Sequence, residues 1–360
     1  MAERVVLHIG LMKSGTSFVQ RRLFGNQERL AERGIHVPGR WRLQVLAASD
    51  VLGRDKPKDA PGHWQWFLDE VAGHPGTVVL SMEFLAGADE EQVRRIAGDL
   101  AGTQVDIVVT LRDLGRNVPA MWQERVKNGG GIAWNDYLKS LKGSKSWAAG
   151  VFWRQQAFAD IVERWAGVFG TDHVHVVTVP PPGAPSDLLW ERFCEAASID
   201  GAELIDTPTA NTSLNASAAR VLVELNRTVP DETDKRPFHR RVKFGLAKDA
   251  LTRIPGDPIG FEAPRWMKKL TDDHIKRVEA SGVRIVGDMD EMACRDVKGI
   301  DPGSLSDAEV AEAAVLTLRQ LVLERVIDPR TLRLRDEADA EAQGGGSPAG
   351  DDDDDDMDDD

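Results

Sequence analysis

Cysteine and tyrosine are scarce in this 360-residue chain, which has two cysteines and one tyrosine. Cys194 and Cys294 cannot build the disulfide framework of a small secreted scaffold, and their spacing matches no common metal-binding motif. Reduced thiols are typical of proteins inside the cell. The cysteine content therefore predicts a cytoplasmic protein and indicates no metal centre.

Long apolar runs are also missing. The apolar stretch at residues 5–9 is too short for the core of a signal peptide, and Lys13 follows it closely. No stretch approaches the roughly 20 apolar residues that a membrane-spanning helix needs. We therefore expect neither a signal peptide nor a membrane span.

An excess of positive charge is missing as well. The formal net charge is −14, and nine aspartates in residues 351–360 supply most of it, so the remaining chain is only mildly acidic. Without a broad basic surface we expect no nucleic-acid partner. The composition of residues 336–360 predicts a disordered acidic tail. Such a tail serves solubility, binds a basic partner or competes for an anion site, and the sequence does not choose among these.

Apolar residues make up 41% of the chain, enough for a substantial core. Four short, mostly apolar runs are typical of strands covered on both faces, and they lie at residues 5–9, 77–81, 105–111 and 174–179. Helical patterns lie between them at residues 90–100, 118–127 and 153–169. Strands that alternate with helices predict an α/β fold around a central parallel sheet.

The chain divides into a core at residues 1–230, a helical C-terminal part of the same domain at residues 231–330, and the acidic tail. Residues 228–264 are charged, with scattered Pro and Gly, and would suit a lid or a peripheral insertion. Ser306 and Glu309 form a capping-box pattern that predicts a helix ending near residue 326.

A loop at residues 10–17 follows the first predicted strand and carries glycines five positions apart, as a Walker A loop does. The Walker lysine would stand where this chain has Thr16, whereas the lysine here is Lys13. Amides at the start of the next helix point toward an anion, and in this chain they belong to Ser14, Gly15, Thr16 and Ser17. The alternative is an ordinary strand-to-helix turn capped by Gly and Ser.

The string Lys13-Ser-Gly-Thr-Ser17, after His8-Ile-Gly10, resembles the 5′-phosphosulfate loop of sulfotransferases that use 3′-phosphoadenosine 5′-phosphosulfate (PAPS). The resemblance is to bacterial, actinobacterial-type members and covers residues 4–230 and 266–291. It implies a P-loop-type three-layer α/β sandwich with helical C-terminal additions. It also implies PAPS as co-substrate, adenosine 3′,5′-bisphosphate (PAP) as product, no required metal, and a small-molecule, glycan or lipid acceptor.

The resemblance implies a second element, a strand that ends in an arginine and binds the 3′-phosphate. Arg112 matches that arginine, but the serine expected eight residues later is Ala120. Either another donor replaces the serine or the affinity for the 3′-phosphate is reduced. The replacement candidates are basic residues, namely Arg116, Arg240, Arg241 and Lys243. The alternatives are a structural ion pair for Arg112 and a solvated basic helix face for residues 240–245.

For the chemistry, Lys13 is the candidate for stabilising the leaving phosphate. Glu83 is the first candidate for the general base, because it follows a strand end that would line the ligand crevice. Relatives often place a histidine before this acid, where this chain has Met82. His63 is the second candidate. The alternatives are a helix cap for Glu83 and core packing for the aromatic stretch at residues 63–67.

Two rival functions remain at this point. A P-loop kinase or nucleotide hydrolase would need a lysine in place of Thr16 and Mg²⁺, for which Asp113 would be a ligand. A degenerate relative would bind PAP without turnover, as Ala120 and Met82 allow. The sequence indicates neither the identity of the acceptor nor the oligomeric state.

Overall fold

The computed structural model describes residues 1–54, 57–143, 146–201, 204, 213–230, 238 and 241–327. The predicted acidic tail at residues 336–360 lies outside the described residues, and so does Arg240.

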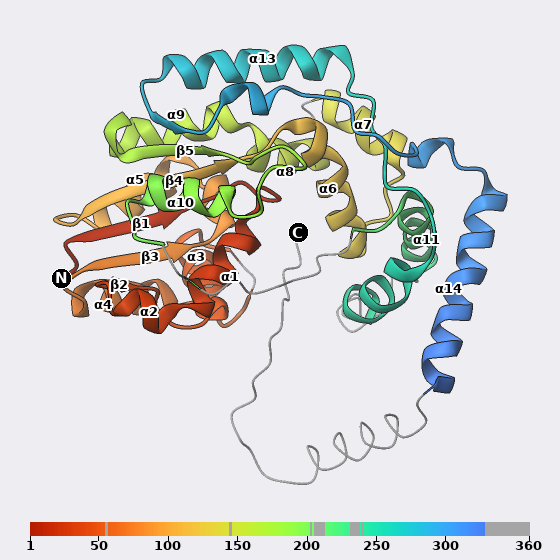
Figure 1. Cartoon of the computed structure of the whole chain (residues 1–360), viewed down its shortest axis with the longest axis horizontal. Coiled ribbons are helices and arrows are strands. Elements are labelled where there is room, and N and C mark those ends of the chain that lie inside the picture. Colours follow the sequence, from red (N-terminus) through yellow and green to blue (C-terminus); the bar gives the residue numbers. More distant parts are fainter. Residues whose placement is uncertain are drawn as a thin grey trace, which may run out of the picture. The chain divides into compact units, whose positions relative to one another are not determined.

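A six-stranded parallel sheet with strand order β2-β3-β1-β4-β5-β6 forms the centre of the fold (Figure 1). The strands are β1 (Arg4–His8), β2 (Ile35–His36), β3 (Thr77–Ser81), β4 (Gln104–Leu111), β5 (Val174–Thr178) and β6 (Arg284–Val286). All four predicted strands are present, and the predicted α/β fold with a central parallel sheet is confirmed. The edge strands β2 and β6 are two and three residues long, too short to produce an apolar run in the sequence.

The helices are α1 (Thr16–Gly25), α2 (Gln27–Ala31), α3 (Trp41–Val51), α4 (His63–Gly73), α5 (Glu90–Asp99), α6 (Leu114–Lys127), α7 (Trp134–Lys142), α8 (Trp147–Gln156), α9 (Phe158–Phe169), α10 (Leu188–Ala197), α11 (Ala216–Arg227), α13 (Arg265–Ala280) and α14 (Asp307–Ile327). Short 3₁₀ turns lie at Glu83–Gly87, Thr171–His173, Leu251–Arg253, Met289–Met292 and Pro302–Ser304, and a π-helical segment lies at Arg241–Ala250.

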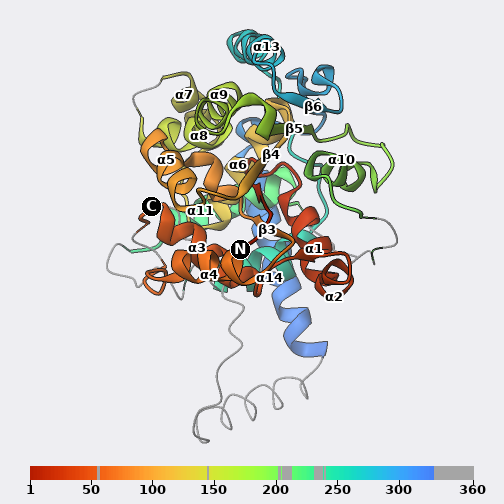
Figure 2. The same ribbon diagram turned by 90° about the vertical axis from the view of Figure 1, so that its left-hand side faces the viewer.

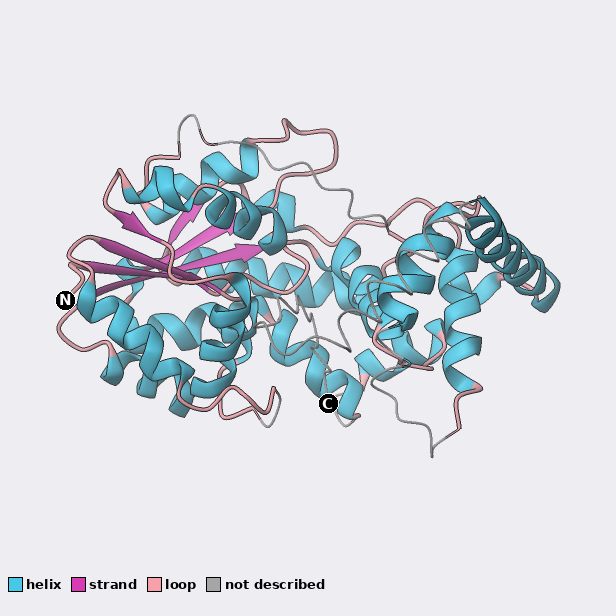
Figure 3. Ribbon diagram, turned by 90° about the horizontal axis from the view of Figure 1, so that it is seen from below, coloured by secondary structure: helices cyan, strands magenta, loops and turns pink. Residues whose placement is uncertain are grey.

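Helices cover both faces of the sheet, which gives three layers (Figures 2 and 3). Helices α1, α2 and α10 lie on one side and α3, α5 and α9 on the other (Figure 2). On the first side, valines from neighbouring strands form one core cluster with apolar residues of α1 and α10, among them Val6, Val79, Val108, Val19, Leu23 and Phe193. Burial of such apolar side chains on both faces selects the parallel arrangement.

One predicted helix is wrong. Residues 153–169 do not form a single helix, because Ala157 (φ −76°, ψ 74°) is not helical and separates α8 from α9. The buried side chain of Gln156, just before the break, donates a hydrogen bond to the Met12 carbonyl at 3.0 Å and accepts one from Asn117 at 2.7 Å. The end of α8 is therefore bound to a distant loop, which the helical pattern of apolar residues does not reveal.

The chain separates into two compact units. The first comprises Met1–Met121, Lys139–Ala210 and Glu262–Val297, and the second comprises Trp122–Leu138, Asn211–Phe261 and Lys298–Asp360. The whole sheet belongs to the first unit. In the second unit, the Trp134 ring lies 5.1 Å from that of Trp122 and 5.7 Å from that of Phe261.

The predicted helix after Ser306 is confirmed in α14 of the second unit. The Glu309 carboxylate accepts hydrogen bonds from the Ser306 amide at 2.8 Å and from its hydroxyl at 2.7 Å. Among the described residues, no helix combines the length and the apolar character that crossing a membrane requires.

Candidate functional site

The loop between β1 and α1 turns through three left-handed backbone positions. They are Gly10 (φ 38°), Lys13 (φ 64°) and Gly15 (φ 83°). Buried Ser14 holds this turn from inside, because its hydroxyl donates to the Leu11 carbonyl at 2.6 Å and accepts from the Leu11 amide at 3.0 Å. The loop is therefore a tight turn that the Ser14 side chain stabilises.

Gly15 is the residue that precedes the first turn of α1. A Cβ atom at this position would collide with the Leu189 side chain of α10, and the positive φ also favours glycine. The amides of Gly15, Thr16 and Ser17 donate no hydrogen bond to any described residue, as expected for the first turn of a helix. Such amides, together with the positive end of the helix dipole, suit an anion.

A buried polar layer supports the loop from below. His8 of β1 contacts the Ser81 hydroxyl at 2.7 Å and the Thr110 hydroxyl at 3.2 Å, and Thr110 in turn contacts the Ser14 hydroxyl at 2.7 Å. Burial lowers the pKa of His8 to about 3, so its imidazole is neutral near pH 7. This layer connects three strands to the loop.

Arg112 stands directly after β4, at the strand end where the sequence predicted an arginine, and its side chain reaches the loop. Its guanidinium donates a hydrogen bond to the Lys13 carbonyl at 3.1 Å. Among the described residues it forms no ion pair with a carboxylate, in contrast to the structural alternative. Burial and the positive charge of Arg116 lower the pKa of Arg112 to about 10, and the charge of Asp113 opposes this shift. A bound anion would compensate the charge of Arg112, whereas the charge of Arg116 is balanced by Asp113.

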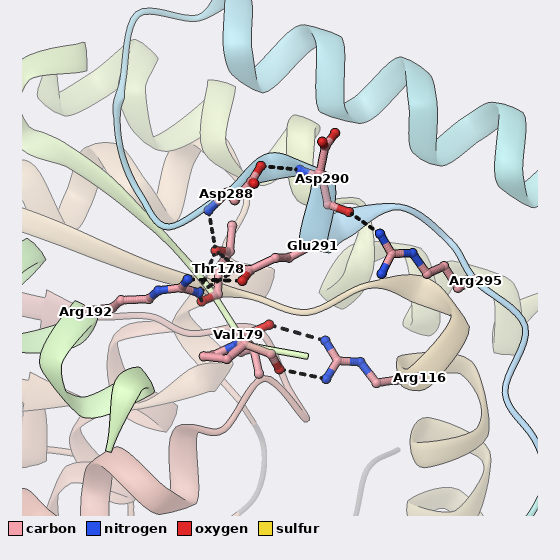
Figure 4. A network of polar contacts seen from close by, with 9 residues as sticks. Arg116, Thr178, Val179, Arg192, Asp288, Asp290, Glu291 and Arg295 are labelled. Carbon is pink, nitrogen blue, oxygen red and sulfur yellow. Dashed lines mark hydrogen bonds and ion pairs between the residues drawn. The ribbon is translucent and has the colours of Figure 1, made fainter. Parts of the chain in front are cut away.

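Arg116 lies in the first turn of α6, and its guanidinium donates hydrogen bonds within the protein (Figure 4). Its guanidinium pairs with the buried Asp113 carboxylate and donates to the Pro180 carbonyl at 3.0 Å and the Val179 carbonyl at 3.3 Å. These contacts tie the start of α6 to the chain after β5. Arg116 therefore contributes its charge next to Arg112 while its hydrogen bonds hold the backbone.

Glu83 begins the 3₁₀ turn after β3 and is brought to α1. The buried side chain of Gln20 donates to the Glu83 carboxylate at 2.9 Å and to the Ser81 carbonyl at 3.0 Å. Gln20 lies one helical turn after Thr16, so the structure positions this carboxylate beside the helix that the loop begins. Met82 is fully buried.

His63 is the first residue of α4, and its Nδ1 lies 3.1 Å from the Ala60 carbonyl oxygen. Within the described residues it makes no hydrogen bond to the loop or to Glu83. The next aromatic residues, Trp64 and Phe67, are buried with ring centroids 5.2 Å apart. These two of the five residues at positions 63–67 pack in the core, whereas Gln65 is exposed.

Two of the other predicted basic residues, Arg241 and Lys243, lie in the π-helical segment of the second unit. Lys243 Nζ lies 3.4 Å from the Glu124 carboxylate there. Arg240 lies outside the described residues. The contribution of Arg240, Arg241 and Lys243 to nucleotide binding stays a prediction.

Three residues next to the site gave no signal in the sequence. Gln20 orients Glu83, Gln156 binds the Met12 carbonyl, and Asn117 binds Gln156. They come from three helices, and only the folded chain brings them to the loop. In the described part of the chain, no group of three or more His, Cys, Asp or Glu side chains is placed to hold a metal ion.

The fold and the site together define an α/β protein whose loop between β1 and α1 presents amides suited to an anion. No family model matches the chain, and no curated protein does. Among solved structures it is similar to a sulfotransferase from Alicyclobacillus acidocaldarius, with a TM-score of 0.40 and 13% sequence identity over 61% of this chain and 91% of that one. A TM-score this low establishes neither a shared fold nor a shared function.

Proposed function

We propose that this protein is a PAPS-dependent sulfotransferase, an enzyme that transfers a sulfuryl group to a hydroxyl or amine of an acceptor. The observation that carries the proposal is that a cation contacts the loop while a carboxylate contacts the helix that the loop begins. Arg112 is hydrogen-bonded to the Lys13 carbonyl, and Glu83 is held by Gln20 on the helix that this loop begins.

The loop would bind the 5′-phosphosulfate. Its hydrogen-bond donors would be the amides of the first helical turn, the Lys13 ammonium and the hydroxyl groups. The binding residues would be Lys13, Ser14, Gly15, Thr16 and Ser17. Arg112 would bind the 3′-phosphate, because a planar guanidinium can donate to two phosphate oxygens. Arg116 supports it with a neighbouring charge. Arg240 and Lys243 are candidates for the contact that Ala120 cannot make.

In the proposed reaction an acceptor oxygen or nitrogen attacks the sulfur, and the bond from sulfur to the bridging phosphate oxygen breaks. Lys13 stabilises the negative charge that develops on that oxygen, and loss of such a preorganised group typically costs about 10²–10³ in rate. Glu83 accepts the proton of the acceptor, oriented by the Gln20 amide. His63 is the second candidate for this base.

One feature of the site disfavours a kinase or nucleotide hydrolase. The Asp113 carboxylate, which would have to hold Mg²⁺, is buried and paired with Arg116. A protein that binds PAP without turnover is favoured by Ala120 and by Met82 in place of an acid–base residue. This second candidate function shares the nucleotide site and differs only in catalysis.

Calorimetric titration with PAP, AMP and ATP with Mg²⁺ tests the nucleotide assignment. We expect metal-independent binding of PAP in preference to AMP, with at least about tenfold weaker PAP binding in Lys13→Ala and Arg112→Ala. Arg95→Ala, on the exposed surface of α5, is the matched control and should bind as the wild type does. Preference for ATP with Mg²⁺ would overturn the proposal.

Turnover is tested separately with radiolabelled PAPS and a panel of phenol, sugar and lipid acceptors. A sulfated product that Glu83→Gln abolishes, with PAP binding retained, supports the enzyme. PAP binding in the absence of any sulfated product supports the degenerate relative instead.

A further inference from the structure

Helix α14 (blue in Figure 1) carries an exposed apolar surface. Val315, Leu318 and Val322 are 63%, 62% and 59% exposed, and the adjacent Leu323 is 38% exposed. Apart from Met1, no other large apolar side chain among the described residues is exposed to this extent. Clustered exposure of this kind marks an interaction surface.

The other side of α14 is already covered. Val310, Ala313 and Thr317 of α14 are buried. Within the second unit, α14 packs against α11. The helix therefore has two apolar faces, of which one is satisfied within the chain. A helix that is apolar on more than one side needs a further partner.

The exposed residues follow a heptad. Ala311, Val315, Leu318 and Val322 are separated by four, three and four residues, which is the spacing of coiled-coil core positions. The β-branched valines occupy the a positions and Leu318 occupies a d position, a combination that favours two-stranded pairing. The sequence of this face therefore matches another helix better than it matches a flat surface.

We propose that the partner is a second copy of this chain, paired through α14 of each copy. The chain that follows the helix is a poor occupant, because residues 328–360 contain only three large apolar side chains, Leu332, Leu334 and Met357, among many carboxylates. A second copy supplies the same valines and leucine. Such self-complementary pairing is the commonest symmetry of soluble oligomers.

Charge determines the orientation. Glu312 and Arg319 both lie beside the apolar stripe at equivalent heptad positions, and neither forms an ion pair within the described residues. If the helices run antiparallel, with Val315 of one copy against Leu318 of the other, Glu312 approaches Arg319 of the second copy. Symmetry forms this pair twice. A parallel arrangement gives no such pairing.

The expected dimer is weak. The stripe from Ala311 to Val322 extends over about 16 Å of helix at 1.5 Å per residue. A stripe of this length buries much less surface than the about 1,600 Å² of a typical stable interface. We therefore expect reversible, concentration-dependent association. The inference does not depend on the proposed enzymatic activity.

Sedimentation velocity of the full chain over a range of concentrations tests the proposal. We expect the weight-average sedimentation coefficient of the wild type to rise toward that of a dimer. Leu318→Glu should weaken dimerisation by at least about a hundredfold, because it places a charge on each copy of the apolar stripe. Since Leu318 is exposed, the variant should keep the circular dichroism spectrum of the wild type.

A charge exchange tests the orientation. Arg319→Glu brings glutamates together and should weaken the dimer by about tenfold, whereas Glu312→Arg combined with Arg319→Glu should restore it. Lys269→Glu, at an exposed position of α13, makes the same change in net charge and should have no effect. A wild type that stays monomeric, or one that binds lipid vesicles through this face instead, would overturn the proposal. A dimer that Leu318→Glu leaves intact, or a double variant that fails to recover, would also overturn it.

Discussion

Lys13 has a backbone conformation that lysine rarely adopts. Its φ of 64° lies in the left-handed region, where a side chain costs about 1–2 kcal/mol relative to the right-handed region. Ser14, Arg112 and Gln156 all hydrogen-bond to the carbonyls of this loop, so the surrounding structure imposes the conformation. Strain of this kind is common where a chain positions a group for function.

The strain at position 13 predicts an inversion of the usual stability order. Lys13→Gly should unfold with a free energy about 1 kcal/mol higher than Lys13→Ala, although glycine normally destabilises a chain relative to alanine. Both variants should lose PAP affinity, because both lack the ammonium group. Urea denaturation together with calorimetry measures the two effects. Equal stability of the two variants would show that the left-handed backbone costs nothing here.

At the scale of elements, β1, β3 and β4 meet the loop through the buried layer of His8, Ser81, Thr110 and Ser14. The apolar runs predicted the three strands well, and residues 77–81 match β3 at both ends. The strand order was not predictable, because it depends on which runs pair across about 40 to 110 residues of chain. The hydroxyl groups around His8 were missed for the same reason.

Burial of neutral His8 predicts a pH dependence of stability. Its pKa is lowered from 6.5 to about 3 by burial, so between these values the unfolded chain binds a proton that the folded chain does not. Stability should therefore fall as the pH decreases, by about 2–3 kcal/mol from this group between pH 7.5 and 4.5.

Urea unfolding of the wild type and His8→Gln at several pH values measures this contribution. Glutamine can still hydrogen-bond to hydroxyl groups but does not titrate, and the other titratable groups are common to both proteins. We expect a shallower loss of stability in acid for the variant. Parallel curves for the two proteins would show that His8 titrates normally.

At the scale of the whole molecule, the nine aspartates of residues 351–360 dominate the net charge of −14. The proposed nucleotide is also an anion, so a tail that reached the loop would compete with it. The loop, Arg112 and Glu83 all belong to the first unit, in which Arg112 contacts the Lys13 carbonyl and Glu83 contacts Gln20 of α1.

Deletion of the residues after Gly344 retains the loop, Arg112 and Glu83. The affinity for PAP should then stay unchanged within about twofold at low salt. Calorimetry of the full and shortened chains measures this, with a salt titration as the control for general repulsion. A clear gain of affinity that disappears in high salt would instead identify the tail as a competitor for the anion site.

The local sequence by itself determined the strand–loop–helix unit around Lys13, the four central strands and the cap of α14. These depend on residues within a few positions of one another, whose periodicity and turn chemistry are visible in the chain. Only the tertiary structure decided that Arg112 reaches the Lys13 carbonyl across 99 residues and that Gln20 reaches Glu83 across 63. Such contacts follow from strand order and helix packing, which the burial of the whole core selects and no short pattern encodes.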